Sequence, residues 1–468
     1  MKPKLKPVLD PAFAPLVLAL GELRQAAAVD GQDVVVGVAR GPENIVTYAT
    51  RIVREGSGGD ERNFQVLERL VKSLLWAAGG YRIVIAGGPV VGERIKAAYR
   101  HGGLRDFDVR FMERVYERPF DVELCGLAEA PGSRESAAPV GRHLDGCRIG
   151  FDAGGSDRKV SAVIDGESVY SEEVVWRPKT NSDPAYHYAG VVDAFRSAAA
   201  QLPRVDAIGV SSAGVYVDNR VMVASLFLEV SDADFEHEVK DLYVRAAQEV
   251  APGAPLVVAN DGDVTALAGA MDLGLDRVLG VAMGTSEAGG YVDGQGNITG
   301  RLNELAFVPV DLNPDAAVDE WSGDHGCGVK YFSQDGVIKL ARAGGITLDP
   351  DATPAEQLAA VQHLLADGHP VAADIFSSIG VCFGYALAWY AEFYELRHVL
   401  LMGRVTSGRG GALLVEHARA VLAAEFPELR IQLHLPDESA RRVGQSVAAA
   451  SLPELASPTT RGATPEAP

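Results

Sequence analysis

The stretch that decides the fold is Val257-Val258-Ala259-Asn260-Asp261, followed by Gly262-Asp263-Val264-Thr265-Ala266-Leu267-Ala268. The apolar residues before Asn260 predict a buried strand, and the segment after Asp261 predicts the start of a helix. A carboxylate at the carboxyl end of a buried strand is held firmly and still faces the region where open α/β sheets bind ligands. The plain alternative is that Asp261 or Asp263 only caps the helix, which is a common use of aspartate.

The composition predicts a globular protein and limits its partners. The 468 residues are 47% hydrophobic and 23% charged, which is enough chain for two or three domains. The formal net charge of −20 disfavours binding to nucleic acid or to an anionic membrane surface. The four cysteines are scattered without a C-x-x-C motif, which favours a reducing compartment, so we expect a cytoplasmic protein.

An earlier segment, Cys147–Ser156, carries the first phosphate-binding signal. A predicted strand ends at Asp152, and Gly154, Gly155 and Ser156 then form a tight turn into a return strand. Two glycines let backbone N–H groups approach a polyphosphate, and the hydroxyl of Ser156 adds a donor. Asp152 could position Mg²⁺ through water, because this ion prefers carboxylates together with substrate phosphates. Taken alone, the segment is a weak signal, because Asp-x-Gly-Gly is short and an ordinary hairpin also accounts for it.

The same pattern of a strand, a turn of glycine and hydroxyl residues, and a return strand recurs later in the chain. A predicted strand over 278–283 leads into Gly284-Thr285-Ser286 and a return strand, and a further strand over 398–402 ends at Gly403. The elements after each hairpin follow a similar order of strands and helices. Such a duplication is more specific than either hairpin alone, and it predicts two lobes that bind a nucleotide polyphosphate, with Gly403 on the adenosine side.

These patterns predict an α/β protein with two lobes around a central cleft and an additional α/β unit at the N-terminus. The expected divisions are an arm over 1–30, the N-terminal α/β unit over 31–126, a linker over 127–145, a first lobe over 146–256, a second lobe over 257–451 whose last helix could return to the first lobe, and a disordered tail over 452–468. We expect the N-terminal unit to bind no nucleotide, because its hairpin turn is Ala39-Arg40-Gly41-Pro42.

Residues 146–451 resemble the ROK family (repressor, open reading frame, kinase) of sugar kinases, within the actin/hexokinase/Hsp70 ATPase superfamily. The residues that carry the resemblance are Asp152-Ala-Gly-Gly-Ser156, Ile208–Gly214, Asn260-Asp261 with Ala266-Leu267-Ala268, Gly284-Thr285-Ser286, Leu400–Gly403 and Gly323–Cys327. The resemblance implies two actin-like (ribonuclease H-like) lobes. It also implies ATP and Mg²⁺ as ligands and Asp261 as the catalytic base.

The chain departs from the family pattern where the family binds zinc and reads the sugar. Glu320 and Ser322 occupy two positions that carry zinc cysteines in the family, and Phe307 replaces its histidine, so that only Cys327 of the four ligands remains. Such a set is poor zinc ligation, and no structural zinc is expected. Phe307 either makes the acceptor pocket more apolar, which predicts poor glucose phosphorylation, or fills core space left by the missing metal.

The sequence therefore predicts an ATP-dependent carbohydrate kinase in which Asp261 accepts the proton of the attacking hydroxyl. Substrate would be held by Asn260, Glu304 and Gly214, and phosphates by Gly154, Gly155, Ser156, Gly284, Thr285, Ser286 and Gly403. The expected partner is a small carbohydrate-like substrate, and we expect binding to neither nucleic acid nor a membrane. The sequence leaves open whether the protein forms a homodimer. Two rivals remain: a non-catalytic regulator that binds a sugar or nucleotide, and an ATPase with a non-sugar acceptor.

Overall fold

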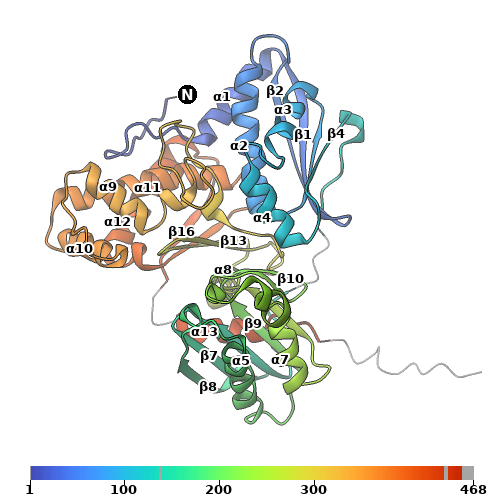
Figure 1. Ribbon diagram of the computed structural model, residues 1–468. Helices are drawn as coiled ribbons and strands as arrows, with labels where there is room; N and C mark the ends of the chain where they lie inside the picture. Colours follow the sequence, from blue (N-terminus) through green and yellow to red (C-terminus); the bar gives the residue numbers. More distant parts are fainter. Residues whose placement is uncertain (1, 136–139, 437–440, 456–468) are drawn as a thin grey trace, which may run out of the picture. The chain divides into compact units, whose positions relative to one another are not determined.

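The computed structural model describes residues 2–135, 140–436 and 441–455, which form two compact units (Figure 1). Unit 1 holds the described residues of Met1–Ser136, Asp276–Gly294 and Arg301–Pro436. Unit 2 holds those of Ala137–Leu275, Gln295–Gly300 and Asp437–Pro468. The chain therefore passes between the two units several times, and each unit is assembled from segments far apart in the sequence.

Unit 2 is built on one five-stranded sheet with the strand order β12-β9-β6-β7-β8. The strands are β6 (Cys147–Ala153), β7 (Asp157–Ile164), β8 (Glu167–Val175), β9 (Ala207–Ser212) and β12 (Leu256–Asn260). β6, β9 and β12 are parallel, while β6, β7 and β8 form an antiparallel meander. The carboxyl ends of β6, β9 and β12 consequently lie side by side at one edge, which is where open α/β sheets bind their ligands.

Helices cover the sheet of unit 2. They are α5 (Pro184–Ala199), α7 (Leu242–Val250), α8 (Asp261–Leu273) and α13 (Arg441–Ala450), and a small hairpin, β10 (Val215–Val217) with β11 (Arg220–Val223), follows β9. Apolar residues of β6 and β9 form one core with α5 and α7. α13 packs on β6, β9 and β7 and contacts α8. This close packing requires Gly150 and Gly209, because a Cβ there would lie 1.8 Å and 1.7 Å from backbone oxygens of α13.

Unit 1 contains the N-terminal sheet, with the strand order β4-β3-β1-β2-β5. Its strands are β1 (Gly31–Gly41), β2 (Asn44–Val53), β3 (Arg82–Ala86), β4 (Asp121–Cys125) and β5 (Arg134–Glu135), and its helices are α1 (Leu16–Val29), α2 (Asp60–Ala78), α3 (Pro89–Ala98) and α4 (Asp106–Tyr116). α2 has the amphipathic spacing expected from Val66, Leu67, Leu70 and Val71, all of which are buried.

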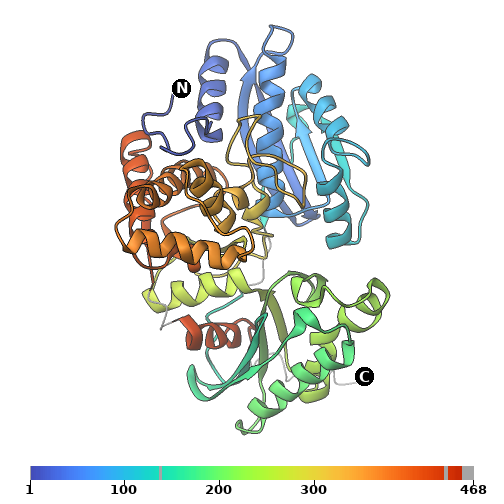
Figure 2. The same ribbon diagram turned by 60° about the vertical axis from the view of Figure 1, so that its left-hand side comes forward.

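The second sheet of unit 1 has the order β14-β13-β15-β16. It consists of β13 (Val278–Met283), β14 (Glu287–Val292), β15 (His398–Met402) and β16 (Gln432–His434), with helices α9 (Gln334–Ala343), α10 (Pro354–Ala366), α11 (Pro370–Tyr390) and α12 (Gly408–Glu425). β13 and β14 are an antiparallel hairpin, and β15 and β16 add in parallel. The orange helices α11 and α12 pack side by side (Figures 1 and 2). The mixed α/β fold predicted from the sequence is confirmed.

One described helix, α11, is long and apolar enough to cross a membrane, but 78% of its apolar window is buried inside the protein. Its packing against α12, α9 and α1 accounts for this composition, because a helix that is apolar all round is typical of a protein core.

The structure divides the chain differently from the sequence-based boundaries. The first lobe was predicted to end at 256, yet β12 pairs with β9 and α8 packs on α13, so unit 2 continues to Leu275. The N-terminal α/β unit predicted over 31–126 does have its own sheet, but it belongs to unit 1 together with the second sheet. The reason is packing: α2 and α4 bury polar and aromatic side chains against residues 303–325, as described below.

The predicted arm and tail also differ from what the structure shows. Within the predicted arm over 1–30, the described residues 2–30 are packed into unit 1, since α1 contacts α11 and Leu16 N donates to Val310 O (3.3 Å). The predicted linker contains β5, which pairs with β2. Leu452 and Pro453 of the predicted tail are buried, and Pro453 O accepts from Arg148 Nη1 (2.7 Å). Residues 456–468 of that tail lie outside the described residues.

Candidate active site

Two carboxylates stand at the carboxyl edge of the unit 2 sheet. Asp152 is the penultimate residue of β6, and Asp261 directly follows β12, with β9 between the two strands. The register places Asp152 opposite Ser211 and Asn260 opposite Ser212. The topology therefore brings together on one sheet two residues that are more than a hundred positions apart in the sequence and that the sequence-based boundaries placed in different lobes.

Asp152 is held by two side chains that the sequence analysis did not assign to the site. Ser211 Oγ donates to Asp152 Oδ1 (3.0 Å), and Gln445 Nε2 of α13 donates to the same oxygen (3.2 Å) and to Ser211 Oγ (3.0 Å). Burial raises the pKa of Asp152 to about 6, a shift that the Ser211 hydrogen bond opposes and the nearby Asp261 carboxylate reinforces. Asp152 is thus fixed in orientation, and its pKa of about 6 lies much nearer to neutral pH than that of an ordinary aspartate.

Asp261 is the first residue of α8 but not its cap. The cap is Asn260, whose Oδ1 accepts from Gly262 N (2.7 Å), while its Nδ2 donates to Gly214 O (2.8 Å). Asp261 Oδ1 accepts a longer bond from Gly262 N (3.0 Å). Burial raises the pKa of Asp261 above the usual aspartate value. Because Asn260 satisfies the helix end, the capping alternative accounts for Asn260 rather than for Asp261.

Gly214 is tied to this arrangement by its backbone. Its φ of +136° suits glycine, and a Cβ there would lie 2.4 Å from Val223 O of the β10–β11 hairpin. The bond from Asn260 to its carbonyl joins the end of β12 to the turn after β9. Asn260 and Gly214 therefore shape the edge of the sheet, and the substrate contacts predicted for them stay a prediction.

The turn between β6 and β7 contains the predicted phosphate loop. Gly154 N donates to Asp157 O (3.0 Å), and Ser156 Oγ donates to Asp157 Oδ2 (3.1 Å). Asp157 is in turn paired with Lys159 Nζ (3.2 Å), which offsets the negative charge that this residue brings to the loop. Gly155 lies beneath the side chain of Lys179, a residue that the sequence analysis did not single out.

Unit 1 gathers the second set of predicted phosphate ligands at the carboxyl edge of its own sheet. Gly284 N donates to Ser286 O (2.9 Å) in a tight turn, and the side chains of Thr285 and Ser286 are exposed. Gly403 follows the parallel strand β15 with a φ of +92°, and a Cβ there would lie 2.4 Å from Met283 O. Only glycine allows this approach, so Gly403 directly adjoins the end of β13 at Met283, next to Gly284.

Glu304 and Phe307 have different environments in unit 1. Glu304 is half-buried at the start of a short 3-10 helix, and its backbone N donates to Trp76 O (3.1 Å). Phe307 is 8% exposed and packs on Trp76, Phe107 and Phe111, with ring centroids 4.3, 5.6 and 6.3 Å away. Phe307 was interpreted either as part of an acceptor pocket or as a residue that fills core space. The structure supports the second interpretation, because the aromatic rings packed on Phe307 belong to α2 and α4.

Beside this aromatic cluster lies a buried network of charges. Asp324 Oδ2 contacts Arg69 Nη1 (2.5 Å), Lys72 Nζ (2.6 Å) and Arg105 Nη1 (2.8 Å). Two further carboxylates balance the charge: Glu68 pairs with Arg105 (2.8 Å), and Asp108 lies 3.6 Å from Lys72. All six side chains are at most 7% exposed. The three cations hold the pKa of Asp324 far below its usual range.

We expect purified protein to contain no stoichiometric zinc. Burial raises the pKa of the Cys327 thiol to about 12, and this thiol lies 3.8 Å from Asp324, which is already paired with three cations. A cysteine binds zinc as the thiolate and a carboxylate must be free to coordinate, so this protonated thiol beside a fully paired carboxylate does not fit the ion. Elemental analysis of protein purified without chelator checks this prediction. About one tightly bound zinc per chain would contradict it.

Glu287 is an uncompensated buried carboxyl in unit 1, directly after the Gly284–Ser286 turn. It is 2% exposed, its Oε1 accepts from Tyr390 Oη (3.2 Å), and its Oε2 has no partner among the described residues. Burial raises its pKa from 4.5 to about 8. Folding therefore favours the protonated acid, and this contribution to stability is full below about pH 4.5 and is lost as pH rises toward 8.

Glu287→Gln should remove this pH dependence. The free energy of unfolding of the variant, minus that of the wild type, should increase by about 1.4 kcal/mol per pH unit between the two pKa values. Urea denaturation of both proteins at several pH values measures this difference directly, so that other titrating groups cancel. A difference that stays constant with pH would show that Glu287 is not protonated in the fold.

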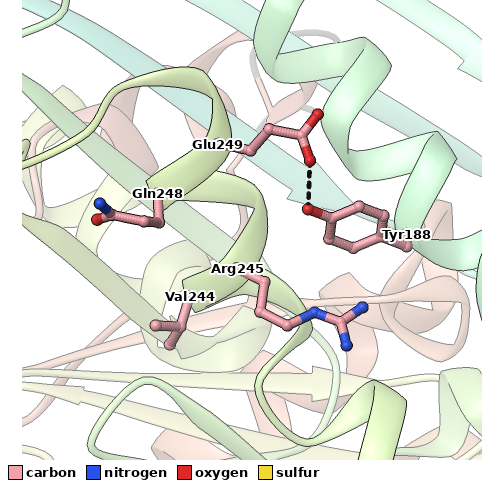
Figure 3. A pocket seen from close by; sticks show the side chains of 5 residues that line it. All are labelled: Tyr188, Val244, Arg245, Gln248 and Glu249. Carbon is pink, nitrogen blue, oxygen red and sulfur yellow. Dashed lines mark hydrogen bonds between the residues drawn. The ribbon is translucent and has the colours of Figure 1, made fainter.

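A surface hollow of about 560 Å³ lies elsewhere in unit 2, between α5 and α7 (Figure 3). Its polar groups are largely paired: Tyr188 Oη donates to Glu249 Oε2 (2.6 Å), and Arg245 lies over the Tyr188 ring at 4.7 Å. Neither Asp152 nor Asp261 lines it. The candidate site therefore rests on the strand-end residues and not on this hollow.

The site residues missed by the sequence analysis are Ser211, Gln445 and Lys179. Ser211 lay within the quoted Ile208–Gly214 segment, and the parallel pairing of β6 and β9 would have placed it opposite Asp152. Gln445 and Lys179 come from elements that no local pattern connects to the hairpin. Among the described residues, no group of three or more His, Cys, Asp or Glu side chains could hold a metal ion.

No protein-family model matches the chain, and no curated protein matches it. Solved structures do. A ROK hexokinase from Thermus thermophilus is similar with a TM-score of 0.50 and 19% identity, covering 65% of this chain and 97% of the other. A ROK-family transcriptional regulator, described as a homologue of the E. coli MLC protein, also has a TM-score of 0.50, with 20% identity, and covers 66% of this chain and 79% of the other. The predicted ROK-family fold is therefore confirmed.

Proposed function

We propose that this chain, which has the ROK-family fold, transfers a phosphoryl group from ATP to a hydroxyl of a sugar or sugar-like acceptor. The observation that carries the proposal is Asp261, whose carboxylate stands at the carboxyl edge of the sheet while Asn260 caps the helix. A half-buried carboxylate with a raised pKa is suited to accept a proton near neutral pH. In phosphoryl transfer, such a residue takes the proton of the attacking hydroxyl.

The residues around Asp261 would orient the reactants. Asn260 fixes the end of β12 against Gly214, so that the edge on which the acceptor lies is rigid. In unit 1, the exposed hydroxyls of Thr285 and Ser286 are available to phosphate oxygens, and a Cβ on Gly284 would meet nothing closer than 4.0 Å. The turn is therefore open to an incoming phosphate, and Glu304 stays the proposed contact for an acceptor hydroxyl.

The donor set of unit 2 fits Mg²⁺. Asp152 and Asp261 are oxygen donors at one edge, and this ion commonly uses one or two carboxylates together with substrate phosphates. Asp152 would hold the ion through water, because Ser211 and Gln445 already fix its Oδ1. When bound, Mg²⁺ neutralises charge on the phosphates. Ser211 and Gln445 keep the Asp152 carboxylate in one orientation, and exclusion of water from Asp261 limits loss of the phosphoryl group to hydrolysis.

Two measurements test the proposal. Isothermal titration with Mg-ATP first shows whether the nucleotide binds, and a coupled assay then follows ADP release over a panel of sugars. We expect at least one sugar to raise ADP release well above the sugar-free rate. ADP release that no sugar stimulates would favour an ATPase with another acceptor.

A non-catalytic regulator is the second candidate function. The observation in its favour is the structural similarity to a ROK-family regulator at the same TM-score as to the hexokinase. The N-terminal residues of this chain form a mixed sheet with helices α2, α3 and α4, and the net charge of −20 disfavours contact with nucleic acid. Mg-ATP or sugar binding without any ADP release would support this alternative.

A further inference from the structure

Lys179 is positioned over the glycine turn of unit 2 by a short 3-10 helix, Pro178–Thr180, that follows β8. A Cβ built on Gly155 would lie 2.8 Å from Lys179 Cε and 3.1 Å from its Nζ. The lysine side chain therefore runs across the open face of Gly155.

The segment that carries Lys179 is tied to the turn that it covers. Trp176 N donates to Ser156 O (3.1 Å), which joins the end of β8 to the turn between β6 and β7. Trp176 and Pro178 are buried, so the backbone before and beside Lys179 is anchored while its side chain is exposed. The fold thus fixes the backbone of Lys179 beside the turn, and the side chain extends from there over Gly155.

Lys179 is also a cation without a counter-ion. Within residues 2–135, 140–436 and 441–455, its ammonium group makes no hydrogen bond and no ion pair. The neighbouring Lys159 differs, because it is paired with Asp157 at 3.2 Å. In a chain with a net charge of −20, an ammonium that lies above a glycine turn and forms no ion pair among the described residues favours an anionic ligand at that position.

We propose that Lys179 binds the terminal phosphoryl group of the nucleotide and steadies it beside Asp261. The inference rests on the proposed function. It adds a phosphate contact from Lys179, which lies in the 3-10 helix after β8 and outside the glycine turn. An ammonium is a compact charge with three donors, which suits the oxygens of a phosphoryl group in transfer. The electrostatic influence of Lys179 on Asp261, which lowers the carboxyl pKa, agrees with their proximity.

The test compares Lys179→Gln, Lys179→Arg and the control Lys96→Gln, which removes the same charge from an exposed site on α3 in unit 1. Affinities for Mg-ATP and Mg-ADP are measured by isothermal titration. We expect Lys179→Gln to weaken Mg-ATP binding about tenfold or more with little change for Mg-ADP, because only ATP carries the terminal group. Lys179→Arg should retain most of the ATP affinity, and Lys96→Gln should match the wild type.

Three results would overturn the inference, and they differ in meaning. Equal affinities of wild type and Lys179→Gln for both nucleotides would mean that Lys179 is a solvated surface residue. An equal loss for ATP and ADP would assign it to the inner phosphates instead. A wild-type protein that binds no Mg-ATP would remove the proposed function together with this inference. Because Lys179 is exposed, thermal unfolding of the variants should match the wild type and exclude misfolding as the cause.

Discussion

Replacement of Asp261 by asparagine is expected to lower phosphoryl transfer by roughly 10²-fold or more, the scale of losing a general base. The amide keeps the shape of the side chain but cannot accept the proton of an attacking hydroxyl. Asn260 caps α8 independently, so the fold and the affinity for Mg-ATP should be retained. The expected signature is a loss in kcat with little change in nucleotide binding.

Asp272→Asn is a matched control for this experiment, because Asp272 lies exposed near the end of the same helix. It should turn over like the wild type. The pH profile gives a second readout: with its pKa raised by burial, Asp261 becomes protonated at a higher pH than an ordinary aspartate. As the pH is lowered, activity should therefore be lost with a midpoint above about pH 4, the usual aspartate pKa. Near-native turnover of Asp261→Asn would rule out the mechanism.

Asp324→Asn should cause the largest loss of stability, on the order of 3–5 kcal/mol, the scale of breaking a buried ion pair by removing one partner. Arg69, Lys72 and Arg105 all contact one carboxylate oxygen of Asp324, and all three are buried. The neutral amide leaves an excess of positive charge in a region where water cannot compensate it. Urea denaturation at neutral pH measures the loss.

The exposed Asp315, in the same loop, provides the control substitution Asp315→Asn, which should change stability by less than about 0.5 kcal/mol. The sign of the pH effect follows from the depressed pKa of Asp324. Its stabilisation is complete above the unfolded-state pKa of about 4 and is lost only as pH falls well below it. The difference between wild type and Asp324→Asn should therefore persist across neutral pH. A loss near that of the control would show that the charge network is not needed for folding.

Strands with continuous apolar runs could be predicted from the sequence almost residue by residue. Val278–Met283 and His398–Met402 are strands in the structure with the predicted bounds. By contrast, no element was predicted over Asp106–Tyr116, which is α4. Its Asp108 is a charged residue that would be expected to face solvent, yet it is buried beside Lys72. Local patterns cannot show such burial, because the compensating charge lies on another element.

The boundary between the units was misplaced for a similar reason. The Val257–Asp261 segment follows the first-lobe elements and precedes the second hairpin, so the sequence alone allowed it to open the second lobe. Its partner is β9, and the pairing with Ile208–Ser212 assigns it to unit 2. The strand-end carboxylates were predictable because strand ends are visible locally. Lys179 and Gln445 were not, because their places depend on how β8 and α13 pack.

The packing of α13 on Gly150 and Gly209 has a consequence for how the protein is made. The helix that packs on the unit 2 sheet, α13, comes after all the strands of that sheet in the sequence, and Gln445, which orients Asp152, lies on it. At ~5–20 residues per second, this helix leaves the ribosome roughly 15–60 seconds after β6, which precedes it by about 300 residues. During that interval the nascent sheet has an uncovered face. Asp152 acquires its partner Gln445 only after α13 has been synthesised, so a chain that stops before this helix would carry the carboxylate without the Gln445 hydrogen bond.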